Sequence, residues 1–211
     1  MPALDTSAFA AALADGACAL DLRPAPAWAA GHIPKSLSMQ FGRLDVVDRM
    51  ELCFRRDATY LLVIEPAALG PVAERLIGDG GYQVGGYLAG GMTAWTAAGL
   101  PTAETSIVDV AELNAQLTSG LRVHLLDVRE SFEFDWLRLP GAVNVPYGEI
   151  WDRHQELDAK ASWVVICADQ MRSATAISVL QRLGFERMTL VMGGLASWTE
   201  AGLPVLKAAK G

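Results

Sequence analysis

The sequence predicts an α/β protein built from two tandem domains, each with a mainly parallel sheet flanked by helices. Short apolar segments of strand length alternate with segments of helical periodicity. The same motifs also occur twice, in the same order, along the chain. With 211 residues, of which 52% are hydrophobic, the chain can form two cores of ordinary domain size. We expect one domain over residues 1–103 and another over 104–211.

The repeat is carried by motifs near both ends of each half. Asp-Leu-Arg at 21–23 recurs as Asp-Val-Arg at 127–129. A Gly-Gly-x-x-x-Trp segment at 90–95 recurs at 193–198, and the Ala-Gly-Leu-Pro that follows it also recurs. Ordered matches with a small drift in spacing are typical of a duplicated domain that has changed loop lengths. The junction is expected at 101–106, where polar residues follow a helix-breaking proline.

Each half is expected to begin with a helix and to continue into buried strands. Helical spacing followed by glycine predicts helices over 7–14 and 109–117. Apolar runs predict two strands in each half: 18–22 and 60–64 in the first, 123–128 and 163–166 in the second. Because the strands alternate with helices, the sheets should be mainly parallel.

Composition and charge exclude several classes of protein. A net charge of −7 leaves no basic surface of the kind that nucleic acids or anionic membranes attract. No run of about 18 apolar residues is present, and the short apolar stretch at 8–14 lacks the basic residues that precede a signal sequence. The three cysteines, Cys18, Cys53 and Cys167, have no paired spacing, which indicates a reducing cytoplasm. No metal-ligand or cofactor motif occurs, so we expect neither.

Chemistry is expected at the end of the strand predicted for 163–166. Cys167 follows this strand directly, and a polar loop then leads into a helical segment. Backbone N–H groups in a tight loop and at a helix start bind anions, which would favour a reactive, accessible thiolate. Arg172 would place a cation near the same point, and Ser173 could cap the helix. Outside such a setting, a lone cysteine is usually a small buried hydrophobic residue.

Together these motifs resemble the rhodanese family, and the resemblance covers nearly the whole chain. It rests on the Asp-x-Arg motif, the segments that begin at Pro34 and Pro140, the Cys-x4-Arg-Ser loop and the Gly-Gly-x-x-x-Trp…Gly-Leu-Pro ending. The resemblance implies parallel sheets of about five strands. It also implies a sulfurtransferase, in which a cysteine takes a sulfane sulfur as a persulfide and passes it to a nucleophile.

On this resemblance, Cys167 is the sulfur carrier, and Asp127 and Arg129 match a buried structural pair. The six-residue span from Cys167 to Arg172, with Ile166 before the cysteine, resembles sulfurtransferases. Relatives whose loop from cysteine to arginine is one residue longer, and which have a histidine before the cysteine, resemble phosphatases. The residues whose loop would hold the persulfide anion or substrate are Ala168, Asp169, Gln170, Met171, Arg172 and Ser173.

Two loop residues depart from the common family pattern. Gln170 stands where many relatives have glycine, and a glutamine would be strained at a positive φ. Asp169 puts a carboxylate beside the proposed anion, where it would oppose thiolate formation if it pointed inward. We expect it to point outward, since exposure is the usual state of aspartate.

The first half is expected to be catalytically silent, because Glu65 stands where Cys167 stands in the second half. Gly70 falls near the position of Arg172, so the loop has no corresponding cation. Glu65 has no nearby histidine or second carboxylate in the sequence with which to form an acid–base pair. We therefore interpret the first domain as a structural partner.

The leading hypothesis is a sulfurtransferase that uses thiosulfate or a low-molecular-weight persulfide as donor and a thiol or other nucleophile as acceptor. The first-half arginines Arg43, Arg55 and Arg56 are candidates for additional donor contacts. A silent copy before an active copy also resembles the rhodanese pairs that follow persulfide dioxygenases, so such an enzyme or a protein sulfur acceptor is a candidate partner. The alternatives are a non-catalytic binding or sulfur-relay module and, less favoured by loop length, a cysteine-dependent phosphatase or arsenate reductase.

Overall fold

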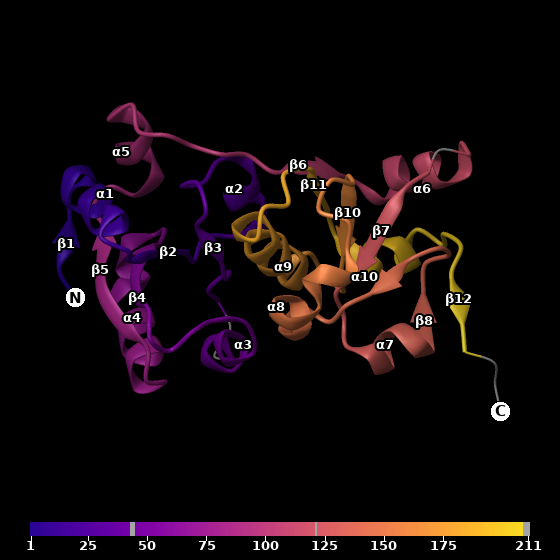
Figure 1. The fold of residues 1–211 in the computed structure, drawn as a ribbon, viewed down its shortest axis with the longest axis horizontal. Coiled ribbons are helices and arrows are strands. Elements are labelled where there is room, and N and C mark those ends of the chain that lie inside the picture. Colours follow the sequence, from indigo (N-terminus) through magenta and orange to yellow (C-terminus); the bar gives the residue numbers. More distant parts are fainter. Residues whose placement is uncertain (43–44, 121, 209–211) are drawn as a thin grey trace. The chain divides into compact units, whose positions relative to one another are not determined.

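A computed structural model describes residues 1–42, 45–120 and 122–208 of the chain. The chain divides into two compact units, Met1–Glu104 and Thr105–Gly211 (Figure 1). Each unit contains its own five-stranded sheet, in which every neighbouring pair of strands is parallel. The predicted α/β architecture of two parallel sheets flanked by helices is confirmed.

The first sheet has the strand order β1-β5-β4-β2-β3. Its strands are β1 (Ala3–Leu4), β2 (Cys18–Asp21), β3 (Leu37–Ser38), β4 (Thr59–Val63) and β5 (Gln83–Leu88). Its helices are α1 (Thr6–Ala14), α2 (Ala25–Ala30), α3 (Val46–Cys53), α4 (Gly70–Asp79) and α5 (Gly91–Ala97), with a 3₁₀ turn at Ala67–Leu69.

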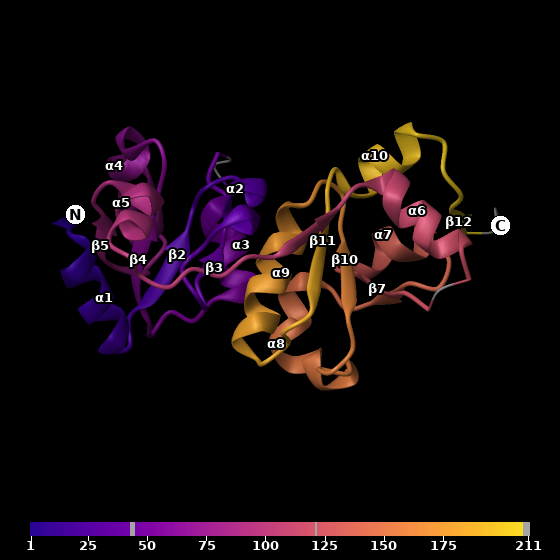
Figure 2. The same cartoon turned by 90° about the horizontal axis from the view of Figure 1, so that it is seen from above.

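The second sheet repeats this topology in the order β6-β11-β10-β7-β9, so β10 is its central strand. Helices α8 and α9 lie on one side of the sheet, and α6 and α10 on the other (Figure 2). An antiparallel pair, β8 with β12, lies outside the five-stranded sheet.

The strands of the second domain are β6 (Ser106–Val108), β7 (His124–Asp127), β8 (Leu137–Arg138), β9 (Val143–Asn144), β10 (Trp163–Ile166), β11 (Met188–Val191) and β12 (Leu206–Lys207). The helices are α6 (Val110–Thr118), α7 (Ser131–Trp136), α8 (Ile150–Arg153), α9 (Met171–Arg182) and α10 (Gly194–Glu200), with 3₁₀ turns at Tyr147–Glu149 and His154–Glu156.

The predicted strands and first helices are present, and no end is shifted by more than one residue. Apolar runs give reliable strand predictions here because parallel strands are covered on both faces; every residue of β10 is buried. Gly16 and Gly120 follow the first helix of each half at φ values of 102° and 80°, a conformation that ends a helix at little cost for glycine.

The repeated tryptophans explain the repeated ending of each domain. Trp95 of α5 and Trp198 of α10 are buried in the cores of their respective domains. The indole of Trp95 donates to the carbonyl of Pro101 (2.9 Å), and that of Trp198 donates to the carbonyl of Pro204 (3.0 Å). Each Gly-Leu-Pro segment is therefore fixed to its core by one polar bond from an otherwise apolar ring.

The Asp-x-Arg motifs form buried ion pairs at the ends of equivalent strands. In the second domain, Arg129 Nη2 lies 2.6 Å from Asp127 Oδ2 and also donates to the carbonyl of Leu137 (2.7 Å). Arg23 makes the same contacts with Asp21 and Gly31. Several hydrogen bonds offset the desolvation of each buried charge, and together they fix the strand end to the following helix.

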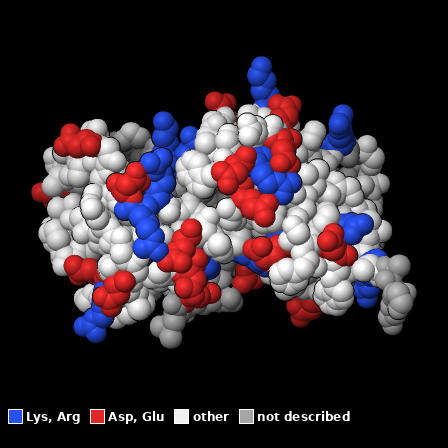
Figure 3. Space-filling model, turned by 60° about the horizontal axis from the view of Figure 1, so that its bottom comes forward, with Lys and Arg blue, Asp and Glu red and all other residues white. Residues whose placement is uncertain are grey.

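Acidic and basic side chains are interspersed on the face of the molecule seen in Figure 3. This mixture agrees with the modest net charge of −7. None of the helices in the described ranges is long and apolar enough to cross a membrane.

Candidate active site

Cys167 lies at the carboxyl end of β10, the central strand of the second sheet. Its Sγ atom accepts a hydrogen bond from the Ser173 amide at 3.4 Å. The side chain is completely buried, so the expectation of an accessible thiolate is wrong for this conformation. The loop from Ala168 to Gln170 follows the strand end and leads directly into α9.

The loop turns at Gln170, which has a φ of +78°. This left-handed conformation is strained for glutamine, as expected from the sequence. The side chain offsets part of that cost, because Gln170 Oε1 accepts a hydrogen bond from the Gly193 amide at 2.9 Å. Gln170 therefore links the loop to the residue that precedes α10.

Ser173 does not cap α9, contrary to the expectation from the sequence. The turn at Gln170 starts the helix at Met171, which places Ser173 at the third helical position. There its amide has no partner within the helix and donates to the sulfur of Cys167 instead. The Ser173 hydroxyl is buried, and in the described part of the chain it has no hydrogen-bond partner.

The N-terminus of α10 holds the loop from the other side. The amide of Leu195 donates to the carbonyl of Cys167 (2.8 Å), and that of Ala196 donates to the carbonyl of Ala168 (2.9 Å). Gly194 makes this approach possible, because a Cβ there would lie 2.5 Å from the Cys167 oxygen. Its φ of +55° also favours glycine. Two donors at the start of a helix are thus used to fix the position of the cysteine.

Asp169 points toward the sulfur, so the expectation that it faces outward is wrong. Its Oδ1 atom lies 4.0 Å from Cys167 Sγ and accepts a hydrogen bond from the Met171 amide at 3.2 Å. An aspartate commonly accepts the amide two residues later, and here that amide also opens a helix, where negative charge is favoured. The Met171 amide is therefore engaged by Asp169.

Arg172 is paired with Glu133 of α7. Two nitrogens of the guanidinium bind the two carboxylate oxygens at 2.5 and 2.9 Å. Burial works to raise the pKa of Glu133, but the hydrogen bonds and charge of Arg172 outweigh it and lower that pKa. The cation expected beside the sulfur is thus partly neutralised by a residue that the sequence did not identify. The only local signal was the spacing of Glu130 and Glu133, which forms a capping box at the start of α7.

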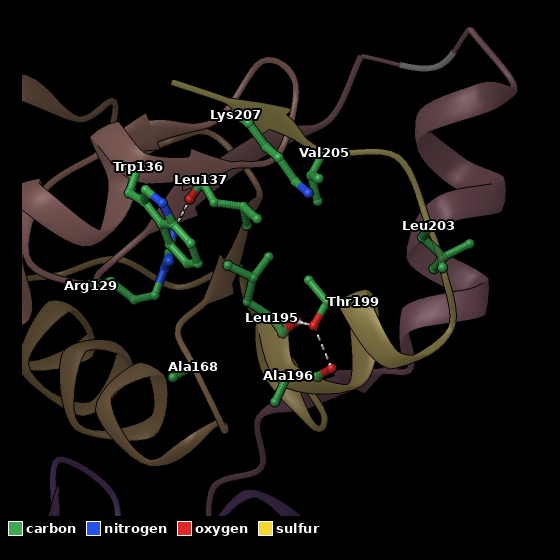
Figure 4. Close-up of a pocket in the computed structure, with 11 residues that line it drawn as sticks. Arg129, Trp136, Leu137, Ala168, Leu195, Ala196, Thr199, Leu203, Val205 and Lys207 are labelled. Atoms are coloured by element: carbon green, nitrogen blue, oxygen red, sulfur yellow. Dashed lines mark hydrogen bonds between the residues drawn. The ribbon is translucent and has the colours of Figure 1, made fainter. Parts of the chain in front are cut away.

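A cavity of about 550 Å³ lies beside Ala168, between α10 and the β8–β12 pair (Figure 4). Its walls are largely apolar, and Figure 4 shows the side chain of Lys207 reaching toward its centre. Arg129 also lines it, although its guanidinium is bound to Asp127. The lining residues are Arg129, Trp136, Leu137, Ala168, Leu195, Ala196, Thr199, Gly202, Leu203, Val205 and Lys207.

The first domain uses the equivalent position differently. Glu65 follows β4, and its carboxylate accepts a hydrogen bond from the Met92 amide of α5 at 3.1 Å. In the second domain the equivalent amide, that of Leu195, binds the carbonyl of Cys167. The Glu65 side chain thus takes the donor that fixes the cysteine loop in the other copy.

The remaining candidates from the first half do not gather into a site. Arg55 pairs with Asp57 at 2.7 Å, and Arg56 pairs with Glu51. Arg43 lies outside the described residues. Within the described ranges, no group of three His, Cys, Asp or Glu side chains could hold a metal ion.

Both halves of the chain match one known domain family. The family described as Rhodanese-like domain matches residues 5–98 and 109–201. The chain is 29% identical over 92 residues to the putative sulfur carrier protein YrkF of Bacillus subtilis, covering 44% of this chain and 50% of YrkF. It is 30% identical over 95 residues to the putative sulfurtransferase YtwF of the same bacterium, covering 45% and 91%. It is 33% identical over 84 residues to the thiosulfate sulfurtransferase GlpE of Actinobacillus succinogenes, covering 38% and 73%.

Two solved structures are also similar to parts of this chain. A rhodanese-related protein from Thermoplasma volcanium matches 48% of this chain and 97% of its own, with 33% identity and a TM-score of 0.43. A thiosulfate sulfurtransferase from Pseudomonas aeruginosa matches 100% of this chain and 44% of its own, with 24% identity and a TM-score of 0.44. The chain thus spans half of YrkF and less than half of the Pseudomonas protein.

The close approach at Gly194 gives a testable prediction. Gly194→Ala should lower the free energy of unfolding by more than Gly202→Ala, because both residues have positive φ but a Cβ at Gly202 meets nothing within 4 Å. Gly202→Ala should cost about 1–2 kcal/mol through backbone strain, and Gly194→Ala at least about 1 kcal/mol more. Urea unfolding of the full chain measures both. Equal losses would mean that contact with the cysteine loop does not require glycine.

Proposed function

Because the chain belongs to the rhodanese family, with two rhodanese-like domains in tandem, we propose that it is a sulfurtransferase that works through Cys167. The observation that carries the proposal is the placement of Cys167 at the end of the central strand, with a helix-start amide donating to its sulfur. Helix N-termini stabilise anions, so this setting suits a thiolate or a persulfide. The sulfurtransferase names of YtwF and GlpE support the same type of activity.

The reaction has two balanced steps. The Cys167 thiolate attacks the outer sulfur of the donor, forming a new S–S bond while the donor's own bond to that sulfur breaks. The donor leaves as a thiolate if it is a low-molecular-weight persulfide, or as sulfite if it is thiosulfate. An acceptor thiolate then attacks the outer sulfur of the Cys167 persulfide, receives that sulfur, and releases the Cys167 thiolate.

The loop residues have separate roles in this proposal. The Ser173 amide and the buried Ser173 hydroxyl supply donors to the sulfur anion, together with loop amides from Ala168 to Arg172 other than that of Met171, which Asp169 engages. The Asp127–Arg129 pair is scaffold, because both charges are buried in contacts with each other. Gln170 positions the loop through its bond to Gly193.

The first domain is proposed to be a catalytically silent scaffold, with Glu65 at the position of the cysteine. The physiological acceptor is a thiol, either a small molecule or a protein. Within the described residues none of the three cysteines is in a disulfide, and we place the protein in the reducing cytoplasm.

A second function is favoured by the complete burial of Cys167. A sulfur closed to solvent suits a relay module that opens only against a partner, such as a persulfide dioxygenase or a protein sulfur acceptor. In that case transfer from small donors would be slow in the isolated protein and would accelerate when the partner is added.

The first test of the proposed function is replacement of Cys167. Cys167→Ser should abolish sulfur transfer from glutathione persulfide to a thiol acceptor, because serine cannot form the intermediate persulfide. Cys18→Ser and Cys53→Ser are matched controls, since both cysteines lie in the first unit, and they should retain most of the activity. Comparable loss in Cys53→Ser would indicate a mechanism with two cysteines and contradict the single-carrier proposal.

The second test separates the two partners of the ion pair. If Arg172 stabilises the sulfur anion as well as binding Glu133, Arg172→Ala should slow transfer by an amount equivalent to about 1.5–3 kcal/mol. Glu133→Gln leaves the guanidinium in place and should slow transfer much less. Transfer rates and melting temperatures of both variants show whether Arg172 acts on the sulfur anion or only stabilises the fold. Equal losses of rate and stability in both variants would show that Arg172 has only a structural role.

A further inference from the structure

The carboxylate of Asp169 lies beside the sulfur of Cys167, the candidate sulfur carrier. Its Oδ1 atom lies 4.0 Å from Cys167 Sγ, and the Met171 amide holds the carboxylate in that orientation. Residues 167–171 form one short turn whose ends are fixed by α9 and α10. The carboxylate is therefore a fixed feature of the site, not a side chain that happens to pass near it.

The carboxylate changes the chemistry of the site in two ways. It places a negative charge beside the atom that a donor must approach. It also engages the Met171 amide, one of the helix-start donors that would otherwise face an anion. The guanidinium that could offset a second negative charge on the donor, that of Arg172, binds the carboxylate of Glu133.

The negative charge of Asp169 should repel the two candidate donors to different extents. Thiosulfate brings two negative charges on a small ion whose sulfur and oxygen atoms all lie close to the reacting bond. The persulfide of a thiol carries at most one negative charge on its reacting sulfurs. Like charges a few ångströms apart near a protein surface repel each other, and the repulsion grows with the number of charges that the donor brings. The doubly charged donor should therefore be disfavoured more strongly.

The cavity beside Ala168 also favours binding of persulfides of thiols over binding of thiosulfate. Its largely apolar walls, which include Trp136, Leu195 and Leu203, provide room for an organic substituent next to the loop. A persulfide of a thiol has such a substituent, and thiosulfate has none. Burial of the carbon atoms of that substituent would favour binding of the persulfide without adding charge at its sulfur.

We propose that Asp169 is a specificity-determining residue that excludes thiosulfate and selects low-molecular-weight persulfides as sulfur donors. The proposal rests on the proposed transfer through Cys167 and specifies its substrate class. It accounts for an inward-facing carboxylate at a site where the chemistry otherwise requires stabilisation of an anion.

The test compares donors in the first half of the reaction. The rate of sulfur loading onto the full-length protein is measured by intact mass with thiosulfate and, separately, with glutathione persulfide. Asp169→Asn removes the charge but keeps an oxygen that can accept from the Met171 amide. It should raise the ratio of the thiosulfate rate to the persulfide rate by about tenfold. Added salt should raise this ratio in the parent protein, through screening, and should have little effect on it in the variant.

Asp158→Asn is a matched control. Asp158 also accepts the amide two residues later, that of Lys160 at 2.8 Å, but it lies before β10, at the opposite end of the strand from Cys167. The ratio of the two rates should stay at the parent value in this variant. A similar rise in both variants would show a general effect of removing negative charge and would overturn the role of Asp169.

Other outcomes would overturn either the role of Asp169 or the proposed function itself. If the parent protein loads equally well from both donors, or if Asp169→Asn leaves the ratio unchanged, Asp169 does not select the donor. If Asp169→Ala raises the ratio and Asp169→Asn does not, the hydrogen bond to Met171 matters and the charge does not, which also overturns the proposal. If neither donor loads sulfur in a way that Cys167→Ser abolishes, the proposed function itself fails, and the selectivity with it.

Discussion

Two backbone hydrogen bonds, from the start of α10 to the carbonyls of Cys167 and Ala168, hold the candidate site together. They fix the cysteine at the end of the central strand and hold the loop that follows it against a second helix. The approach is so close that only glycine fits at position 194. The chain then turns at Gln170, and the start of α9 directs the Ser173 amide at the sulfur.

The two halves of the fold share an architecture and differ at the strand end that carries the candidate site. Both halves keep the glycine pair before the last helix, the buried tryptophan and the Asp-x-Arg ion pair. At the strand end, however, the carboxylate of Glu65 binds the amide that the cysteine loop binds in the other half. The helix-start donor is satisfied in both copies, so a carboxylate in place of the thiol leaves that amide paired.

Much of the fold could be predicted from the sequence because its signals are local or repeated. Strand β10 is a run of apolar residues that is buried on both faces, and the repeat shows that the same arrangement occurs twice. Parallel topology then places Cys167 at a strand end before a helix, whatever the details of the loop. The strain expected at Gln170 was also predictable, since it depends only on backbone sterics.

The electrostatics of the site could not be predicted in the same way. The orientation of Asp169 depends on one amide two residues away, against a general preference of aspartate for solvent. The pairing of Arg172 in α9 with Glu133 in α7 joins residues far apart in the sequence, which only the tertiary fold brings together. The position of Ser173 inside α9 follows from the turn at Gln170, which starts the helix at Met171, and the burial of Cys167 depends on tertiary packing.

The central claim, that Cys167 carries the transferred sulfur, is tested most directly by locating that sulfur. The full-length protein is incubated with glutathione persulfide, and its cysteine peptides are then analysed by mass spectrometry. The account predicts one added sulfur atom on the peptide that contains Cys167, lost again when an acceptor thiol is added. An added sulfur on the peptides of Cys18 or Cys53, or none on any peptide, would contradict it.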